Sequence, residues 1–212
     1  MHITWLGQAC FKIEVKSHNE EVIILTDPFD PEKTGLKLPR TLVADLVLKT
    51  SPDSAYPVEG REGKKPLVIS GPGEYEMKGV FVYAIPLKHN SGSGEYILRL
   101  EAEDMVLVHT GGLNHVPEEV ELQEIEGLDV LMAPVGGGEA LDGKKAAELV
   151  SELEPRLVIP MLYKTEGLKP KLDGVEPFLK AVGAKSETLP KLKLTRKDLP
   201  SDDMRVVVLE KV

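Results

Sequence analysis

Cysteine and histidine are both scarce in this chain. It has a single cysteine, Cys10, so no disulfide can form within the chain and no zinc site can be built from cysteine pairs. The five histidines set a second limit, because a metal centre rich in imidazole would need nearly all of them. Cys10 stands in a strand-like apolar run, which favours a buried structural role over a reactive thiol.

Basic residues and long apolar runs are also lacking. The 26 Lys and Arg residues are outnumbered by 35 Asp and Glu residues, which gives a formal net charge of −9. Such a chain repels a phosphate backbone, so we expect no nucleic-acid partner. No run approaches the roughly 18 apolar residues of a membrane helix, and the first residues lack the basic and apolar regions of a signal peptide. The sequence therefore predicts a cytoplasmic protein without a membrane span.

The chain does contain clear secondary-structure signals. Its first half carries short β-rich runs separated by Gly, Asn and charged residues, which predict strands. Its second half alternates amphipathic helices with strands of the buried type. The helices are expected at 117–125, 142–153 and 175–182, and the strands at 130–135 and 157–161. Asp142 is placed to cap the second of these helices and Gly183 to end the third. We therefore predict an α/β (α+β) fold, formed as one domain over residues 1–212, with two sheets and helices outside them.

Several stretches, taken in order, resemble one family. They are Ile3-Thr4-Trp5-Leu6-Gly7 with Ala9-Cys10-Phe11, Leu25-Thr26-Asp27-Pro28, Ala44-Asp45-Leu46-Val47-Leu48, Ser70-Gly71-Pro72-Gly73-Glu74-Tyr75-Glu76, Asp129-Val130-Leu131, Pro134-Val135-Gly136-Gly137-Gly138, Ala146-Ala147-Glu148-Leu149-Val150 and Val158-Ile159-Pro160-Met161. Together they resemble the small metallo-β-lactamase-fold proteins described as Zn-dependent hydrolases. The resemblance covers roughly residues 1–165. It implies a four-layer αββα metallo-β-lactamase sandwich, with the active cleft at the edge where loops of both sheets meet.

The resemblance also implies where metal ligands would stand. The family carries a Thr-His-x-His-x-Asp-His loop, which here begins at Thr50 and has Ser51, Asp53, Ala55 and Tyr56 at its four ligand positions. A later histidine of the family matches His89. The two remaining positions, an Asp in a Gly-Asp turn and a final His, hold Gly and Leu162. One ligand position thus keeps its residue, one holds a different donor, and five hold residues that do not bind metal in the usual way.

We expect from this count that the dinuclear zinc site is lost, because about four donors must close the coordination shell of each ion. The predicted function is then that of a non-catalytic binding or interaction protein that needs no cofactor. It would bind either a small molecule in the cleft that the family uses for catalysis or a protein partner. Exposed sheet edges would also permit self-association into a homo-oligomer.

A hydrolase is the alternative hypothesis, acting on a phosphodiester, ester or lactone. One version binds a single zinc ion through His89 and Asp53, with His109 or His115 as a further ligand. Another version needs no metal and uses Ser51, Asp53 or Tyr56. Asp27 has two interpretations: the resemblance places it behind the loop that begins at Thr50, where it would accept hydrogen bonds from that loop, and it is equally compatible with a simple turn at the end of a strand.

A phosphate-binding pattern also occurs, because residues 138–144 match G-x-x-x-x-G-K between a strand and a helix. Lys145 stands where a Ser or Thr would hold magnesium, and Glu139 and Asp142 would place negative charge against the phosphates. We therefore favour a structural turn over a nucleotide site.

Overall fold

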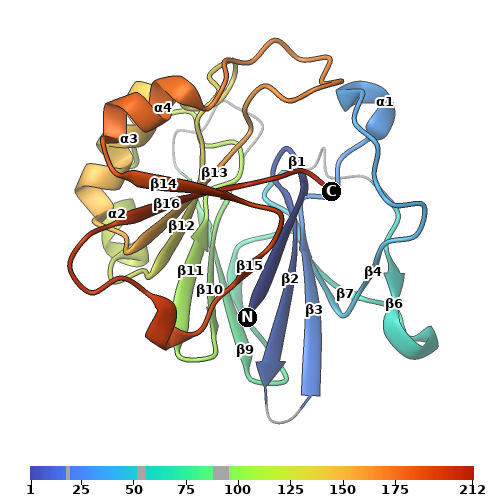
Figure 1. The fold of residues 1–212 in the computed structure, drawn as a ribbon. Helices are drawn as coiled ribbons and strands as arrows, with labels where there is room; N and C mark the ends of the chain where they lie inside the picture. The colour runs from blue at the N-terminus through green and yellow to red at the C-terminus, as the bar shows by residue number, and fades with distance from the viewer. Residues whose placement is uncertain (18–19, 52–55, 88–95) are drawn as a thin grey trace.

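Two large β-sheets share one buried core, and most of the helical residues lie outside one of them (Figure 1). The computed structural model describes residues 1–17, 20–51, 56–87 and 96–212. A small two-stranded sheet lies beside the six-stranded one, with strands β4 (Val43–Ala44) and β6 (Glu59–Gly60). The mixed α/β fold predicted from the sequence is confirmed.

The six-stranded sheet has the order β15-β1-β2-β3-β5-β7. Its strands are β1 (His2–Gly7), β2 (Cys10–Ser17), β3 (Glu20–Thr26), β5 (Leu46–Leu48), β7 (Leu67–Ile69) and β15 (Leu192–Lys193). Strands β1, β2 and β3 pair antiparallel with one another, while β3, β5 and β7 run parallel. Alternation along β2 sends Phe11, Ile13 and Val15 to the central core and Cys10 to the opposite face.

The eight-stranded sheet has the order β14-β16-β13-β12-β11-β10-β9-β8. Its strands are β8 (Gly73–Met77), β9 (Val80–Pro86), β10 (Tyr96–Ala102), β11 (Met105–His109), β12 (Val130–Pro134), β13 (Leu157–Met161), β14 (Lys185–Leu189) and β16 (Arg205–Leu209). Every residue of β12 and β13 is buried, as their continuous apolar runs predicted. From β11 through β12, β13 and β16 to β14 the strands are parallel, so their carboxyl ends meet at one edge.

The helices are short, and α3 and α4 each have one end that the sequence marks clearly. They are α1 (Pro31–Thr34), α2 (Glu119–Ile125), α3 (Gly143–Leu153) and α4 (Glu176–Val182), with 3-10 turns at Arg61–Gly63 and Arg196–Asp198. Asp142 caps α3 by accepting hydrogen bonds from the backbone N–H groups of Lys144 and Lys145, both at 3.0 Å. Gly183 ends α4 with a φ of +66°. Both ends agree with the sequence prediction.

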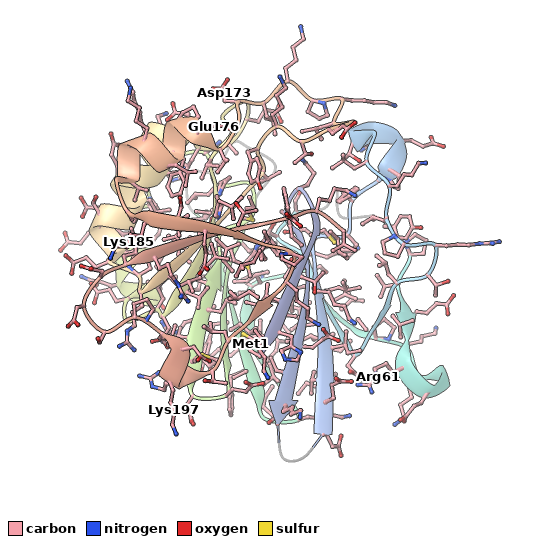
Figure 2. All side chains as sticks on the ribbon, viewed as in Figure 1. Met1, Arg61, Asp173, Glu176, Lys185 and Lys197 are labelled. Carbon is pink, nitrogen blue, oxygen red and sulfur yellow. The ribbon has the colours of Figure 1, made fainter. Side chains whose placement is uncertain are left out.

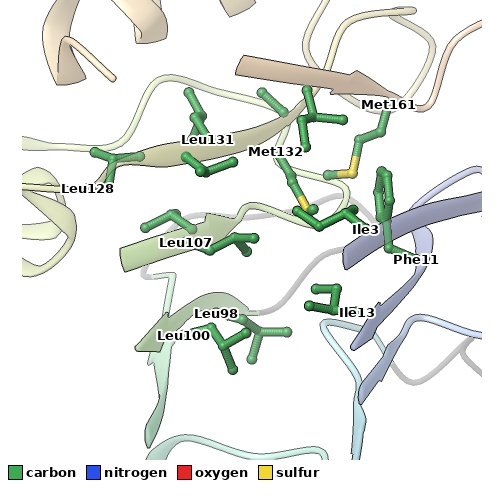
Figure 3. Close-up of a cluster of buried hydrophobic side chains, with 14 of the residues drawn as sticks. Ile3, Phe11, Ile13, Leu98, Leu100, Leu107, Leu128, Leu131, Met132 and Met161 are labelled. Carbon is green, nitrogen blue, oxygen red and sulfur yellow. The ribbon is translucent and has the colours of Figure 1, made fainter. Parts of the chain in front are cut away.

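The two sheets pack through a dense apolar layer (Figure 3). Ile3, Phe11 and Ile13 come from the six-stranded sheet and meet Leu98 and Met132 of the other sheet. A second, smaller cluster covers the outer face of the six-stranded sheet. It contains Leu6, Cys10, Leu25, Phe29, Leu36, Leu42, Ala44 and Val47. The connection around α1 therefore takes the place of a full helical layer on that side.

Most charged side chains lie on the outside of the molecule, as Lys185 and Lys197 illustrate (Figure 2), whereas Asp27, Glu121 and Asp129 are buried. None of the helices in the described part of the chain combines the length and the apolar character needed to cross a bilayer.

Candidate functional site

A cavity of about 350 Å³ opens at the edge where strands of both sheets end. The turn between β1 and β2 contributes Gln8, the end of β3 contributes Asp27, and the end of β5 contributes Thr50 and Ser51. Gly112 follows β11 and Leu162 follows β13. The rest of the described lining consists of Ala9, Phe29, Asp30, Lys33, Thr34, Glu139 and Pro170.

Asp27 holds the start of the loop that follows β5. The backbone N–H of Thr50 donates to Oδ1 of Asp27 at 2.7 Å, and the Thr50 hydroxyl donates to Oδ2 at 2.7 Å. Both residues are more than 90% buried, so these charge-assisted bonds are little weakened by water. Asp27 adopts a φ of +37°, and its own N–H donates to the Leu48 carbonyl. The expected hydrogen bonds between Asp27 and this loop are therefore present.

Thr50 also forms the contact that joins the two sheets at the cavity. Gly111, in the turn after β11, has a φ of +55° and packs directly on the Thr50 side chain. A Cβ added to Gly111 would lie 2.6 Å from Cβ of Thr50 and closer still to its hydroxyl oxygen. The position therefore requires glycine both for its backbone conformation and for space.

His109 lies behind the cavity wall and is almost completely buried. Its Nε2–H donates to the Ala9 carbonyl at 2.9 Å, and its Nδ1 accepts from the Gly111 N–H at 3.2 Å. These two bonds define a neutral imidazole with the proton on Nε2. Burial lowers the pKa of His109 below its usual 6.5, although the Asp27 carboxylate, 3.9 Å from Nδ1, acts in the opposite direction. His109 thus ties β11 to the turn between β1 and β2.

This burial predicts a pH-dependent stability. Because the folded state disfavours imidazolium, the unfolded chain binds more protons below pH 6.5, and stability should fall as the pH drops from about 6.5 toward 5. His109→Gln should flatten this part of the profile, measured by urea unfolding at several pH values. His2→Gln, in β1, removes a different imidazole and is the comparison variant. An identical slope in wild type and His109→Gln would contradict the prediction.

Cys10 carries no accessible thiol. It is fully buried, and burial, with a smaller contribution from Asp27, raises the pKa of its thiol well above the usual value. The expected structural role of Cys10 agrees with its place in the smaller apolar cluster.

Gln8 is a site residue that the sequence did not reveal. It occupies the turn between β1 and β2 with a φ of +52°, lines the cavity, and is only 8% exposed. Its buried Nε2 has no hydrogen-bond partner among the described residues. A lone glutamine beside Gly7 carries no pattern that distinguishes it from a surface turn residue, so only the three-dimensional arrangement identifies it.

The remaining candidates from the sequence are distributed unevenly. Ser51 lines the cavity, whereas Tyr56 packs against the smaller apolar cluster and donates from its hydroxyl to the Pro39 carbonyl at 3.4 Å. His115 is half-buried, with Nδ1 2.9 Å from Oδ1 of Asn114, and its Nε2 has no partner within the described chain. Asp53 and His89 lie outside the described residues.

The described residues do not form a metal site by themselves. Within 1–17, 20–51, 56–87 and 96–212, no group of three or more His, Cys, Asp or Glu side chains is placed to hold an ion. Asp27 uses both oxygens on Thr50, and His109 uses both ring nitrogens. Of the candidate ligands that are described, His115 alone presents a ring nitrogen without a partner within these ranges.

The phosphate-loop pattern has a structural explanation. The Asp142 carboxylate already accepts from the N–H groups at the start of α3, where a phosphate would bind. Gly137 and Leu141 close the turn through a backbone bond of 3.0 Å. This geometry supports the structural interpretation of residues 138–144.

Known proteins resemble this chain over most of its length. A family model described as a β-lactamase superfamily domain matches residues 2–162. A UPF0173 metal-dependent hydrolase from Thermococcus onnurineus is 29% identical over 218 aligned residues, covering 88% of this chain and 94% of the relative. Its counterpart from Thermococcus kodakarensis is 28% identical, with the same coverage of 88% and 94%.

A solved structure supports the same similarity. The crystal structure of a proposed Zn-dependent hydrolase of the metallo-β-lactamase superfamily from Thermotoga maritima is 31% identical, with a TM-score of 0.79. The alignment covers 99% of this chain and 98% of the Thermotoga maritima protein. The expected metallo-β-lactamase fold is therefore confirmed.

These similarities correct two expectations from the sequence. We expected a non-catalytic binding protein and no cofactor, but the relatives are named metal-dependent hydrolases, so both expectations are wrong. The ligand count considered only one arrangement of donors, at the positions implied by the family resemblance. Such a count does not exclude a site assembled from other side chains.

Proposed function

Because the chain belongs to the β-lactamase superfamily, we propose that it is a metal-dependent hydrolase that acts at the cavity between its two sheets. The observation that carries this proposal is the construction of the cavity. Asp27, Thr50 and Gly111 interlock there, and they fix the ends of β3, β5 and β11 relative to one another. A rigid rim of this kind can hold a substrate in one orientation, which is a large part of enzymatic rate enhancement.

We propose His89, Asp53 and His115 as the metal ligands. Two imidazoles and one carboxylate are the ligand types of many mononuclear catalytic zinc sites. His115 is preferred to His109 because its Nε2 lacks a partner among the described residues, while both nitrogens of His109 are engaged. A contact between Nδ1–H of His115 and Oδ1 of Asn114 would leave the lone pair of the buried Nε2 unengaged. A bound ion would supply Lewis acidity and an activated water.

The other described residues support this site without touching the ion. Asp27 orients the backbone at Thr50, from which the segment carrying Asp53 continues. His109 stays neutral and anchors the turn that carries Gln8. The apolar side chains of Phe29, Leu162 and Pro170 form part of the cavity wall and would contact the body of a substrate.

Metal analysis tests the proposal directly. The purified protein is loaded with Zn²⁺ or Mn²⁺, desalted and analysed for metal, and hydrolysis of p-nitrophenyl acetate, δ-valerolactone and bis(p-nitrophenyl) phosphate is measured. We expect about one retained ion per chain and hydrolysis of at least one substrate that chelation abolishes. His89→Ala and His115→Ala should lose both properties, and the control His2→Ala should keep both. No retained metal together with no metal-dependent hydrolysis would refute the proposal.

A further inference from the structure

We propose that the Gln8 side-chain amide is a substrate-binding donor in the cavity, and that it selects uncharged acyl compounds such as esters and lactones. This inference rests on the proposed function for the chemistry that follows binding. Its basis is the conformation, burial and hydrogen bonding of the turn between β1 and β2, together with the charges around the cavity.

The turn that carries Gln8 is held rigidly. The indole N–H of Trp5 donates to the Gln8 carbonyl at 2.8 Å. The next carbonyl, that of Ala9, accepts from the Thr26 hydroxyl at 2.8 Å and from His109 at 2.9 Å. Three side chains from three strands therefore fix a backbone whose φ of +52° is uncommon for a residue other than glycine. An unfavourable backbone conformation that is held so firmly is typical of functional positions.

The amide of Gln8 is buried without compensation. The residue is 8% exposed, and Nε2 has no partner among the described residues. A buried donor of this kind destabilises the free protein, because it has given up hydrogen bonds to water without replacement. Nε2 itself is shielded from solvent, but the Gln8 residue lines the cavity, so a change of its side-chain rotamer would bring the donor to the acceptor oxygen of a ligand bound there.

The charges around the cavity indicate which acceptor fits. The described lining carries three carboxylates (Asp27, Asp30 and Glu139) and one ammonium group (Lys33). This excess of negative charge disfavours a phosphate or carboxylate ligand, and one divalent ion would neutralise it without making the cavity positive. A carbonyl oxygen accepts a hydrogen bond from an amide without carrying a charge. The uncharged carbonyl of an ester or lactone therefore fits both features.

The first test replaces the donor and keeps the length of the side chain. Gln8→Met should lower kcat/KM for p-nitrophenyl acetate and δ-valerolactone by about ten-fold or more, the effect of losing one hydrogen bond. The same variant should melt at an equal temperature or about 2–4 °C higher, because it removes an unpaired buried amide. The matched control is Gln123→Met on the exposed face of α2, which should change neither quantity. A merely structural glutamine would instead lower the melting temperature when replaced.

The second test measures binding without turnover. δ-Valerolactam is an uncharged cyclic amide with the same carbonyl as the lactone, and it should raise the melting temperature of wild type and Gln123→Met. The shift should be absent in Gln8→Met, and inorganic phosphate should give no shift in any of the three proteins.

The outcomes separate this inference from the proposed function. Metal-dependent hydrolysis that is unchanged in Gln8→Met, or that is confined to the phosphodiester, would overturn the role of Gln8 and leave the hydrolase proposal intact. Lactam binding that depends on Gln8 without any hydrolysis would support the binding role and overturn the hydrolase. Absence of both hydrolysis of the acyl substrates and lactam binding in wild type would overturn the inference.

Discussion

Replacing Gly111 by alanine should destabilise the protein by about 2–4 kcal/mol and abolish the proposed hydrolase activity. The new Cβ would lie 2.6 Å from Cβ of Thr50, so the two sheets would have to separate at the rim of the cavity. Overpacking of a close contact typically costs about 1–3 kcal/mol, and about 1 kcal/mol more comes from an alanine at a φ of +55°. Urea unfolding and substrate hydrolysis would measure the two effects.

A second glycine provides a control that separates the backbone strain of a positive φ from the steric clash with Thr50. Gly127 has a φ of +70°, but a Cβ added there would meet nothing within 4 Å, so Gly127→Ala should lose only about 1 kcal/mol and keep its activity. Introducing Gly111→Ala into a Thr50→Ala background should cost less than in wild type, because the nearest colliding atom, the hydroxyl oxygen, is gone while the contact with Cβ remains. Equal losses for Gly111→Ala and Gly127→Ala would show that the contact with Thr50 is unimportant.

Asp27→Asn should lower kcat/KM by about 100-fold and destabilise the protein by about 3 kcal/mol. Asparagine tolerates a positive φ, so the backbone at +37° is little affected and the change acts on hydrogen bonding. With its oxygen on the Thr50 N–H, the new amide places its NH₂ group against the Thr50 hydroxyl, which must then rotate and accept, so both charge-assisted bonds to the carboxylate are lost. The loop that follows Thr50 would then shift, and small displacements of groups near a reacting centre cost orders of magnitude in rate.

Asp30→Asn is the matched comparison, because Asp30 lines the same cavity but uses its carboxylate to cap α1 through the Glu32 N–H at 2.8 Å. It should cost no more than about 1 kcal/mol and leave kcat/KM within a factor of about three. If Asp27→Asn were no more damaging than Asp30→Asn, Asp27 would have no special role in holding the loop.

The parts of the fold that could be predicted are those with strong local signals. The continuous apolar runs of β12 and β13 and the Asp142 cap of α3 each depend on neighbours in the sequence. The strands β8 and β14 were not predicted. They are edge strands whose residues are largely exposed or half-buried, so neither carries a clear apolar pattern. Their formation depends on pairing with β9 and β16, which the local sequence does not encode.

The site shows the same division between local and distant information. Asp27 could be predicted as a support for the loop because Thr-Asp-Pro follows a strand in the family that the chain resembles. The need for glycine at position 111 comes from Thr50 in the other sheet, and the burial of Gln8 comes from the packing of both sheets. No local sequence pattern predicts the contact between Gly111 and Thr50 or the burial of Gln8, because both depend on segments that are distant in the sequence.

The bond between His109 and Ala9 joins residues 100 positions apart, and it forms only when β11 lies against the turn of the first hairpin. Contacts between such distant segments are the slowest to form during folding, since a long loop must close first. The cavity should therefore be completed late, after strand pairs of sequence neighbours such as β2–β3 and β10–β11, as should the β1–β15 pair that joins His2 to Lys193. In a refolding experiment, recovery of lactam binding should lag behind recovery of β-structure, so that ligand binding reports the docking of the two sheets.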